Sequence, residues 1–267
     1  MDFKRIATIV LGLPIVVIFL VFANKYMVDV LFALVTIISM HEYFNAFKEK
    51  ANPVKWIGYI SAIAISFIHI IPTNYILPII TVTIPTIIII LFLHIIITNM
   101  KITLNDIMIT FFGICYISLF TMFIPMVKGI ENGSILIWYI FIASWGTDTF
   151  AYLVGKRFGK HKFSKVSPNK SIEGCISGLI GAIILCLIYT YIVNSYLSMN
   201  ISYTFILVLS IILSILSQIG DFSASCIKRY AEIKDYGNLL PGHGGMLDRI
   251  DSVIFIAPVA YLLLTLI

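Results

Sequence analysis

The chain alternates between long apolar runs and short polar segments. Nine runs have lengths at or near that of a membrane-spanning helix: roughly 6–23, 27–47, 54–72, 75–97, 105–127, 134–155, 172–194, 202–220 and 251–267. A helix needs about 20 residues to cross about 30 Å of hydrocarbon, and backbone groups in lipid must be hydrogen-bonded within the segment. The pattern therefore predicts an all-α, polytopic membrane bundle of about nine transmembrane helices.

Composition supports this prediction. The 267 residues are 60% hydrophobic and only 12% charged, with a mean hydropathy of +1.03. A soluble domain carries about 25% charged residues, so this class is excluded. The four cysteines form no C-x-x-C pair and lie in or beside apolar runs, so we interpret them as small apolar residues of helices.

The basic residues predict an orientation, because cytoplasmic loops are enriched in Lys and Arg. With the N-terminus in the cytoplasm, all but two of the 18 basic residues, Lys25 and Lys128, fall in inner segments. The C-terminus is then outside. We expect a single membrane domain, with N-terminal helices in 1–140 and catalytic helices and cytoplasmic loops in 141–267. A compact chain rich in Ile and Lys is typical of a prokaryotic plasma membrane.

Polar and charged residues are concentrated in two inner loops, at about 155–171 and 220–250. Acidic residues lie at the ends of the apolar runs that flank these loops, and they are Asp148, Glu173, Asp221, Asp248 and Asp251. A carboxylate near the bilayer is costly and therefore indicates function. We expect the two loops to form one site on the cytoplasmic side.

Spacing groups some of these residues. Asp221, Ser225 and Lys228 fall at i, i+4 and i+7, on one face of a helix. A carboxylate, a hydroxyl and an ammonium suit a metal-bound phosphate, although an ion pair within the helix explains the spacing equally well. Asp248 and Asp251 lie three residues apart, and with Asp221 they either gather around Mg²⁺ or simply balance nearby basic residues.

A glycine cluster separates these acidic groups. Gly242, Gly244 and Gly245 allow unusual backbone angles, and successive N–H groups can cradle an anion. His243 would hydrogen-bond a phosphate, transfer a proton, or only stabilise the turn.

In the first loop, the lysines orient the protein and attract anionic lipid. Ser171 and Glu173 open the next helix, whose positive end suits a phosphate.

The region 225–251 closely resembles the signature of the CDP-diacylglycerol synthases, also called phosphatidate cytidylyltransferases. The matching residues are Ser225, Lys228, Arg229, Lys234, Asp235, Gly237, Leu240, Pro241, His243, Gly244, Gly245, Asp248, Arg249 and Asp251. Residues 148–155 and 167–174 resemble two further blocks of the same family. The chain departs from the family pattern in having Asn169 for lysine, Ser171 for threonine and Phe222 for leucine.

The resemblance implies that CTP and phosphatidic acid react to give CDP-diacylglycerol and pyrophosphate. It also implies Mg²⁺, a possible second cation such as K⁺, contact with membrane lipids, a homodimer and no nucleic-acid partner. Asp221 and Asp248 would bind the metal.

We expect the resemblance to extend to further site residues. The catalytic set is Asp221, Lys228, Arg229, His243, Asp248, Arg249 and Asp251. The substrate-binding set is Asp148, Lys160, Ser167, Lys170, Ser171, Glu173, Ser225, Lys234, Asp235, Gly244 and Gly245.

Two other functions remain open. A CTP-dependent enzyme similar to a polyprenol kinase would release CDP and a lipid phosphate. An ion-coupled secondary transporter would use Asp148 and Asp221 as coupling sites. Polar residues at one cytoplasmic face, rather than at the midplane of broken helices, argue against transport.

Overall fold

The computed structural model describes residues 17–267, except 72, 165, 169, 240–241 and 243. The described secondary structure is helical, and the only strand-like pairing there is an isolated bridge between Lys162 and Ser171. The prediction of an all-α protein is confirmed for this part of the chain. The first apolar run lies largely outside the described residues.

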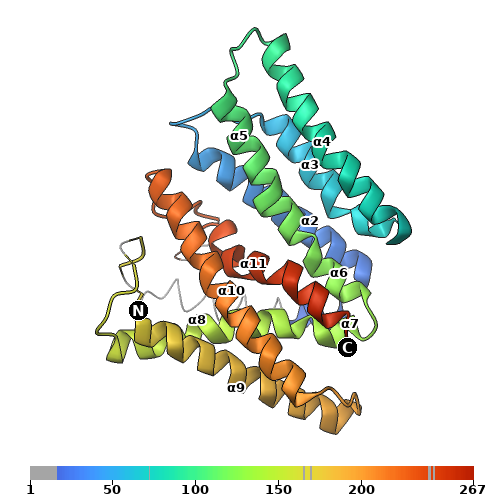
Figure 1. The fold of residues 1–267 in the computed structure, drawn as a ribbon, viewed down its shortest axis with the longest axis vertical. Helices are drawn as coiled ribbons and strands as arrows, with labels where there is room; N and C mark the ends of the chain where they lie inside the picture. Colours follow the sequence, from blue (N-terminus) through green and yellow to red (C-terminus); the bar gives the residue numbers. More distant parts are fainter. Residues whose placement is uncertain (1–16, 72, 165, 169, 240–241, 243) are drawn as a thin grey trace. The chain divides into compact units, whose positions relative to one another are not determined.

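The helices follow the predicted runs closely (Figure 1). Their bounds are α2 Lys25–Ala46, α3 Lys55–Ser66, α4 Thr73–Ile97, α5 Leu104–Gly113, α6 Phe123–Gly129, α7 Gly133–Leu136, α8 Trp138–Phe158, α9 Ile172–Leu197, α10 Tyr203–Tyr230 and α11 Leu247–Leu264. A short 3₁₀ turn covers Ile68–Ile70, and a π-helical segment, Ile114–Leu119, continues α5.

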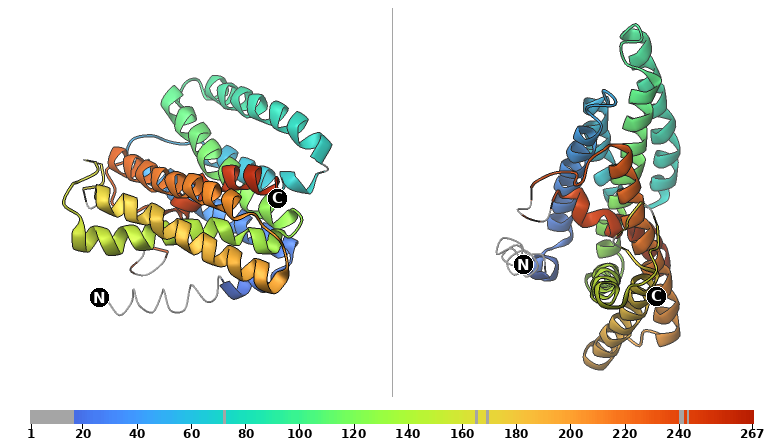
Figure 2. Two further views of the ribbon diagram at one scale, coloured as in Figure 1. Left: turned by 60° about the horizontal axis from the view of Figure 1, so that its bottom comes forward. Right: turned by 90° about the vertical axis from the view of Figure 1, so that its left-hand side faces the viewer.

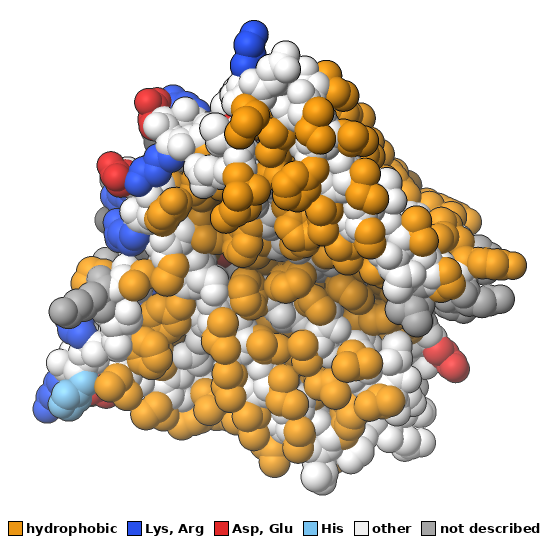
Figure 3. Space-filling view, turned by 45° about the horizontal axis from the view of Figure 1, so that its top comes forward, with side chains coloured by type: hydrophobic (Ala, Val, Ile, Leu, Met, Phe, Trp, Pro, Cys, Tyr) orange, Lys and Arg blue, Asp and Glu red, His pale blue; other side chains and the backbone are white. Residues whose placement is uncertain are grey.

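Five helical stretches of the described chain are long and apolar enough to cross a membrane. They are Lys25–Ala46, Pro78–Ile97, Leu104–Gly129, Ile172–Leu197 and Tyr203–Tyr230. Hydrophobic side chains are spread across the central part of the face shown in Figure 3. On α9, Ile176, Ile180, Ile184 and Ile188 recur every fourth residue and are all exposed. An apolar stripe of this kind, exposed on an apolar helix, is what a lipid-facing surface requires.

The chain divides into two compact units. The first comprises Met1–Met126 and Ala231–Arg249, and the second comprises Val127–Tyr230 and Ile250–Ile267. Helix α11 therefore begins in the first unit and continues in the second. The expected single membrane domain stays a prediction.

Aromatic rings on α2 organise the first unit. Phe44 packs over Gly58 of α3 and Tyr43 packs over Gly113 of α5, so a side chain at either glycine would collide with a ring. At the start of α5, Asp106 accepts hydrogen bonds from Thr103 N at 2.7 Å and from Asn52 N at 2.6 Å. This carboxylate caps α5 and ties it to the α2–α3 connection.

Small residues bring the helices of the second unit together. Helices α8 and α9 lie side by side (Figure 2), and a Cβ added to Gly178 would lie 2.7 Å from the carbonyl oxygen of Thr147. The Thr147 hydroxyl donates to Ser214 Oγ of α10 at 2.8 Å. Close approach between small residues is a usual way for helices to associate in lipid. These contacts hold α8, α9 and α10 together, and these helices carry polar residues of the candidate site.

Candidate active site

Asp221 lies in the C-terminal part of α10 and forms an ion pair with Lys170. The Lys170 ammonium also lies 4.3 Å from the centre of the Phe222 ring. The carboxylate and the ammonium are each about one quarter exposed, at 27% and 25%. The structure thus brings together one residue from each of the two loops singled out in the sequence.

The backbone of the first loop fixes the position of Lys170. Phe163 N donates to Lys170 O at 3.1 Å, and Ile172 N donates to His161 O at 2.9 Å. Lys170 N in turn donates to Ser167 O at 3.1 Å, which closes the turn between them. Lys170 therefore approaches Asp221 from a braced loop and does not depend on the attraction of charges alone.

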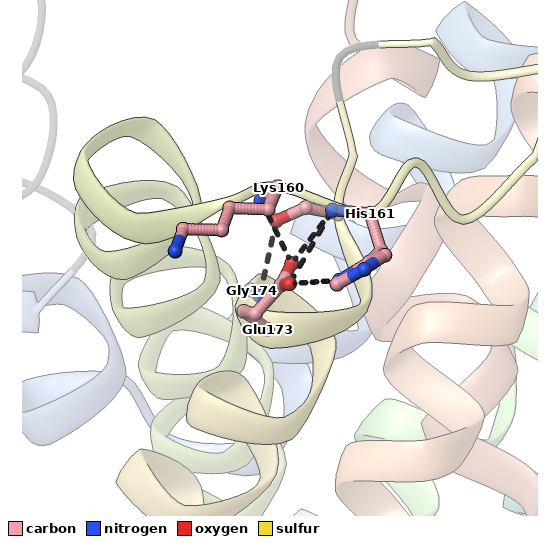
Figure 4. A network of polar contacts seen from close by, with 5 residues as sticks. Lys160, His161, Glu173 and Gly174 are labelled. Carbon is pink, nitrogen blue, oxygen red and sulfur yellow. Dashed lines mark hydrogen bonds and ion pairs between the residues drawn. The ribbon is translucent and has the colours of Figure 1, made fainter.

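Ser171 and Glu173 hold the base of the same loop. Ser171 is the N-cap of α9, where its hydroxyl accepts from Gly174 N at 3.1 Å. Glu173 accepts from His161 Nδ1 at 2.6 Å and from the backbone N–H groups of Lys160 and His161 at 3.2 and 3.3 Å (Figure 4). Both side chains therefore have structural partners within the loop, and their predicted part in substrate binding stays a prediction.

A second carboxylate, Asp251, is buried beside this pair. Its Oδ1 accepts from Ser252 N at 2.7 Å, and the charges of Asp221, Asp148 and Lys228 act on it. The α10 and α11 backbones approach closely here, because a Cβ on Gly220 would lie 2.6 Å from Asp251 O. Three carboxylates and two lysines thus gather in the second unit.

Asp248 lies at the start of α11, in the part of the chain that belongs to the first unit. It is buried, and its Oδ2 accepts from Tyr236 N at 2.8 Å and from Gly245 N at 2.9 Å. Gly244 has a φ of +81°, and a Cβ there would lie 2.8 Å from Asp248 Oδ2. Gly242 is also left-handed, with a φ of +78°. The glycines therefore let the loop fold onto the carboxylate. His243 lies outside the described residues.

Glu42 of α2 holds the end of this loop through hydrogen bonds to its backbone. Its carboxylate is buried and accepts from Met246 N at 2.9 Å and Leu247 N at 2.8 Å, the backbone groups at the start of α11. A side chain at Gly237 or Gly245 would run into the same carboxylate. A carboxylate at a helix N-terminus satisfies free N–H groups and opposes the helix dipole. Glu42 thereby places the first turn of α11, which carries Asp248.

An ion pair holds the beginning of the same loop. Lys50 Nζ lies 2.7 Å from Glu232 Oε1, and this hydrogen bond and the lysine charge lower the pKa of Glu232. Further along the loop, Lys234, Asp235 and Arg249 are exposed. These three predicted site residues are therefore accessible to a soluble ligand.

The family of the chain follows from comparison with known proteins. The profile of the cytidylyltransferase family matches residues 3–267. The chain belongs to the cytidylyltransferase family. This confirms the resemblance found in the sequence.

Individual relatives agree with this family. The chain is 39% identical over 157 residues to the phosphatidate cytidylyltransferase of Bacillus subtilis (strain 168), covering 58% of the chain and 55% of the relative. It is 39% identical over 153 residues to that of Thermotoga maritima, covering 56% of each. It is 44% identical over 135 residues to that of Staphylococcus haemolyticus, covering 50% of each. The chain thus spans about half the length of the curated relatives it matches.

The donor set fits Mg²⁺ only if other ligands complete the site. Among the described residues, no group of three or more His, Cys, Asp or Glu side chains is arranged to hold a metal. Mg²⁺ often binds through one or two carboxylates, with water and substrate phosphates as the remaining ligands. Asp221 and Asp248 are acidic residues of the type required.

Sequence reasoning missed two residues of this region, Glu42 and His161. The signal for Glu42 was present, because it is a carboxylate inside an otherwise apolar run. It lies some 200 residues from its partners, so nothing local in the sequence pairs it with them. His161 lies among the basic residues of the first loop, and no sequence pattern pairs it with Glu173, whose side-chain partner it is.

We predict that Glu42→Ala releases the loop before α11. Two hydrogen bonds to a charged group, each contributing about 1.5–3 kcal/mol, would be lost. Tryptic cleavage after the exposed Lys234, followed by mass spectrometry in detergent, should accelerate at least about tenfold, because cleavage reports the population of the open loop. Glu49→Ala is the control, since Glu49 is exposed and forms its ion pair with the neighbouring Lys48, at 3.8 Å. Equal cleavage rates in the two variants would contradict the anchoring role.

Proposed function

We propose that the chain is a phosphatidate cytidylyltransferase that converts CTP and phosphatidic acid into CDP-diacylglycerol and pyrophosphate for phospholipid biosynthesis. Family membership and the names of the three relatives support this activity. The structural observation that carries it is the Lys170–Asp221 pair in the C-terminal part of an apolar helix. A site in that position is accessible both to a lipid headgroup and to a soluble nucleotide.

The reaction needs little help from a base. A phosphate oxygen of phosphatidic acid, already an anion, forms a bond to the α-phosphorus of CTP, and the bond to pyrophosphate breaks. The main barrier is the repulsion between two anions, so positioning and charge stabilisation supply most of the catalysis. Lys170, Lys228 and Arg229 in one unit, and Lys234 and Arg249 in the other, are the groups that neutralise this charge. Lys170 exchanges Asp221 for a substrate phosphate.

Two cations are part of the proposal. Asp221 and Asp248 would hold Mg²⁺, and a second cation such as K⁺ would share the site. A bound Mg²⁺ supplies Lewis-acid neutralisation of phosphate oxygens. Asp251 lies one turn after Asp248 in α11, and its buried carboxyl group interacts with the charges of Asp221 and Asp148.

We also propose nine transmembrane helices with a cytoplasmic N-terminus and an outer C-terminus. The protein would lie in a prokaryotic plasma membrane as a homodimer, with the site facing the cytoplasm. The uneven distribution of basic residues supports this orientation, which also places the site where CTP is present.

The activity is tested with purified protein, labelled CTP and phosphatidic acid in mixed micelles. We expect labelled CDP-diacylglycerol and stoichiometric pyrophosphate, loss of both with EDTA, and recovery with Mg²⁺. Release of CDP together with a newly phosphorylated lipid would identify a kinase. Solute flux into proteoliposomes without CTP consumption would identify a transporter.

The metal-binding carboxylates are tested by removing one charge at a time. Asp221→Asn and Asp248→Asn should each lower kcat by about 10²–10³-fold, the effect of losing several kcal/mol of charge stabilisation. Each should also need more Mg²⁺ for half-maximal rate. Glu131→Gln, which changes an exposed carboxylate between α6 and α7, should stay within about twofold of the parent protein. Near-normal turnover of Asp248→Asn at ordinary Mg²⁺ would exclude Asp248 as a ligand.

The orientation is tested with single cysteines in a protein whose four native cysteines are replaced. On intact bacterial cells, a membrane-impermeant maleimide should label Glu131→Cys and Ile267→Cys but not Lys160→Cys. Permeabilised cells should show labelling at all three positions. Labelling of Lys160→Cys in intact cells would place the first loop outside and refute the proposed topology.

A further inference from the structure

An apolar groove of about 410 Å³ lies directly beside the Lys170–Asp221 pair. Its lining comes from the first loop and from α10: Phe163, Ser164, Val166, Ile215, Gln218, Ile219, Phe222, Ser223 and Cys226. This volume falls within the range of about 300–1,000 Å³ that is usual for ligand sites. The groove lies entirely within the second unit.

The groove follows the long axis of α10. Ile215, Ile219, Phe222 and Cys226 are spaced at i, i+4, i+7 and i+11, so they share one face of the helix. Ile215 lies about 10 Å below Phe222 along the axis, at a rise of about 1.5 Å per residue. This stretch belongs to an apolar helix long enough to cross a membrane. The groove therefore runs from the charged end of α10 toward the hydrocarbon.

One residue joins the apolar and charged parts. Phe222 lines the groove, follows Asp221 in sequence and contacts the Lys170 ammonium, 4.3 Å from its ring centre. Phe163 from the loop stacks on the same ring, with centroids 4.6 Å apart. A single ligand with an anionic head and an apolar tail would satisfy both ends of this surface.

We propose that the groove binds an acyl chain of phosphatidic acid and thereby holds the lipid phosphate at Lys170. This inference rests on the proposed function, since it names where that substrate lies. The base of CTP fits less well, because reading a base requires directed hydrogen bonds and the lining is mainly apolar. The Gln218 amide already donates to Cys175 O at 3.2 Å, and the two phenylalanine rings stack on each other.

The first test blocks the groove. Ile219→Trp should raise the half-saturating surface concentration of phosphatidic acid about tenfold, with kcat and the KM for CTP nearly unchanged, as expected for loss of binding alone. The penalty should be smaller for a short-chain phosphatidic acid. The matched control is Ile184→Trp on α9, since Ile184 and Ile219 are 46% and 44% exposed and only Ile219 lines the groove. Equal effects of the two variants would overturn the proposal, as would a raised KM for CTP alone.

The second test measures binding without turnover. Vesicles containing phosphatidic acid with a photoactivatable acyl chain should label the α10 peptide around Ile215 and Phe222. Unlabelled phosphatidic acid should compete, whereas phosphatidylcholine should not, and Ile219→Trp should weaken the labelling about tenfold at subsaturating lipid. Labelling insensitive to headgroup would show ordinary bilayer contact and refute the groove.

Because this readout needs no CTP, a protein that binds the lipid but makes no CDP-diacylglycerol would refute the proposed function alone. Ile215→Phe serves as the second variant if Ile219→Trp is not recovered folded.

Discussion

A carboxylate at the end of an apolar helix must be satisfied, because leaving a buried charge without partners costs several kcal/mol. Each acidic group of the candidate site meets this constraint differently. Glu42 accepts hydrogen bonds from two backbone N–H groups at the start of α11. Asp248 accepts hydrogen bonds from the backbone N–H groups of Tyr236 and Gly245. Asp221 forms an ion pair with Lys170. The loops take their shapes from these contacts, so the proposed site residues also stabilise the local fold.

The three acidic groups differ in what remains available to a ligand. Glu42 has both carboxylate oxygens engaged by backbone groups that do not titrate, which suits a permanent anchor. Asp221 is partly exposed and held by a flexible lysine. The flexible lysine side chain can turn from Asp221 to an incoming phosphate. Asp221 is partly exposed, so water can then hydrate its carboxylate. Glu42 therefore fixes the start of α11, whereas the ion pair of Asp221 is open to exchange with a ligand.

The sequence predicted most helices because the apolar runs are long and bounded by charged segments. It did not predict the π-helical segment after α5, since no local residue pattern distinguishes one extra residue per turn. Asp221 and Asp248 were selected from their position and from the family resemblance. Glu42 was missed because its partners lie far away in sequence, and the structural role of Glu173 was missed because a helix N-terminus suits a carboxylate and a phosphate equally.

The apolar face of α10 and the Lys170–Asp221 pair beside it suit the proposed meeting of a lipid and a nucleotide. A phosphate on a diacyl chain moves freely in the bilayer plane, and it must be restrained in depth and direction before it can attack. Lysine alone gives weak direction, because its ammonium acts nearly as a point charge. An apolar groove ending beneath that ammonium supplies the missing direction, since an acyl chain lying along Ile215 and Ile219 leads its headgroup toward Lys170. Burial of apolar surface in the groove then contributes to the affinity for the lipid.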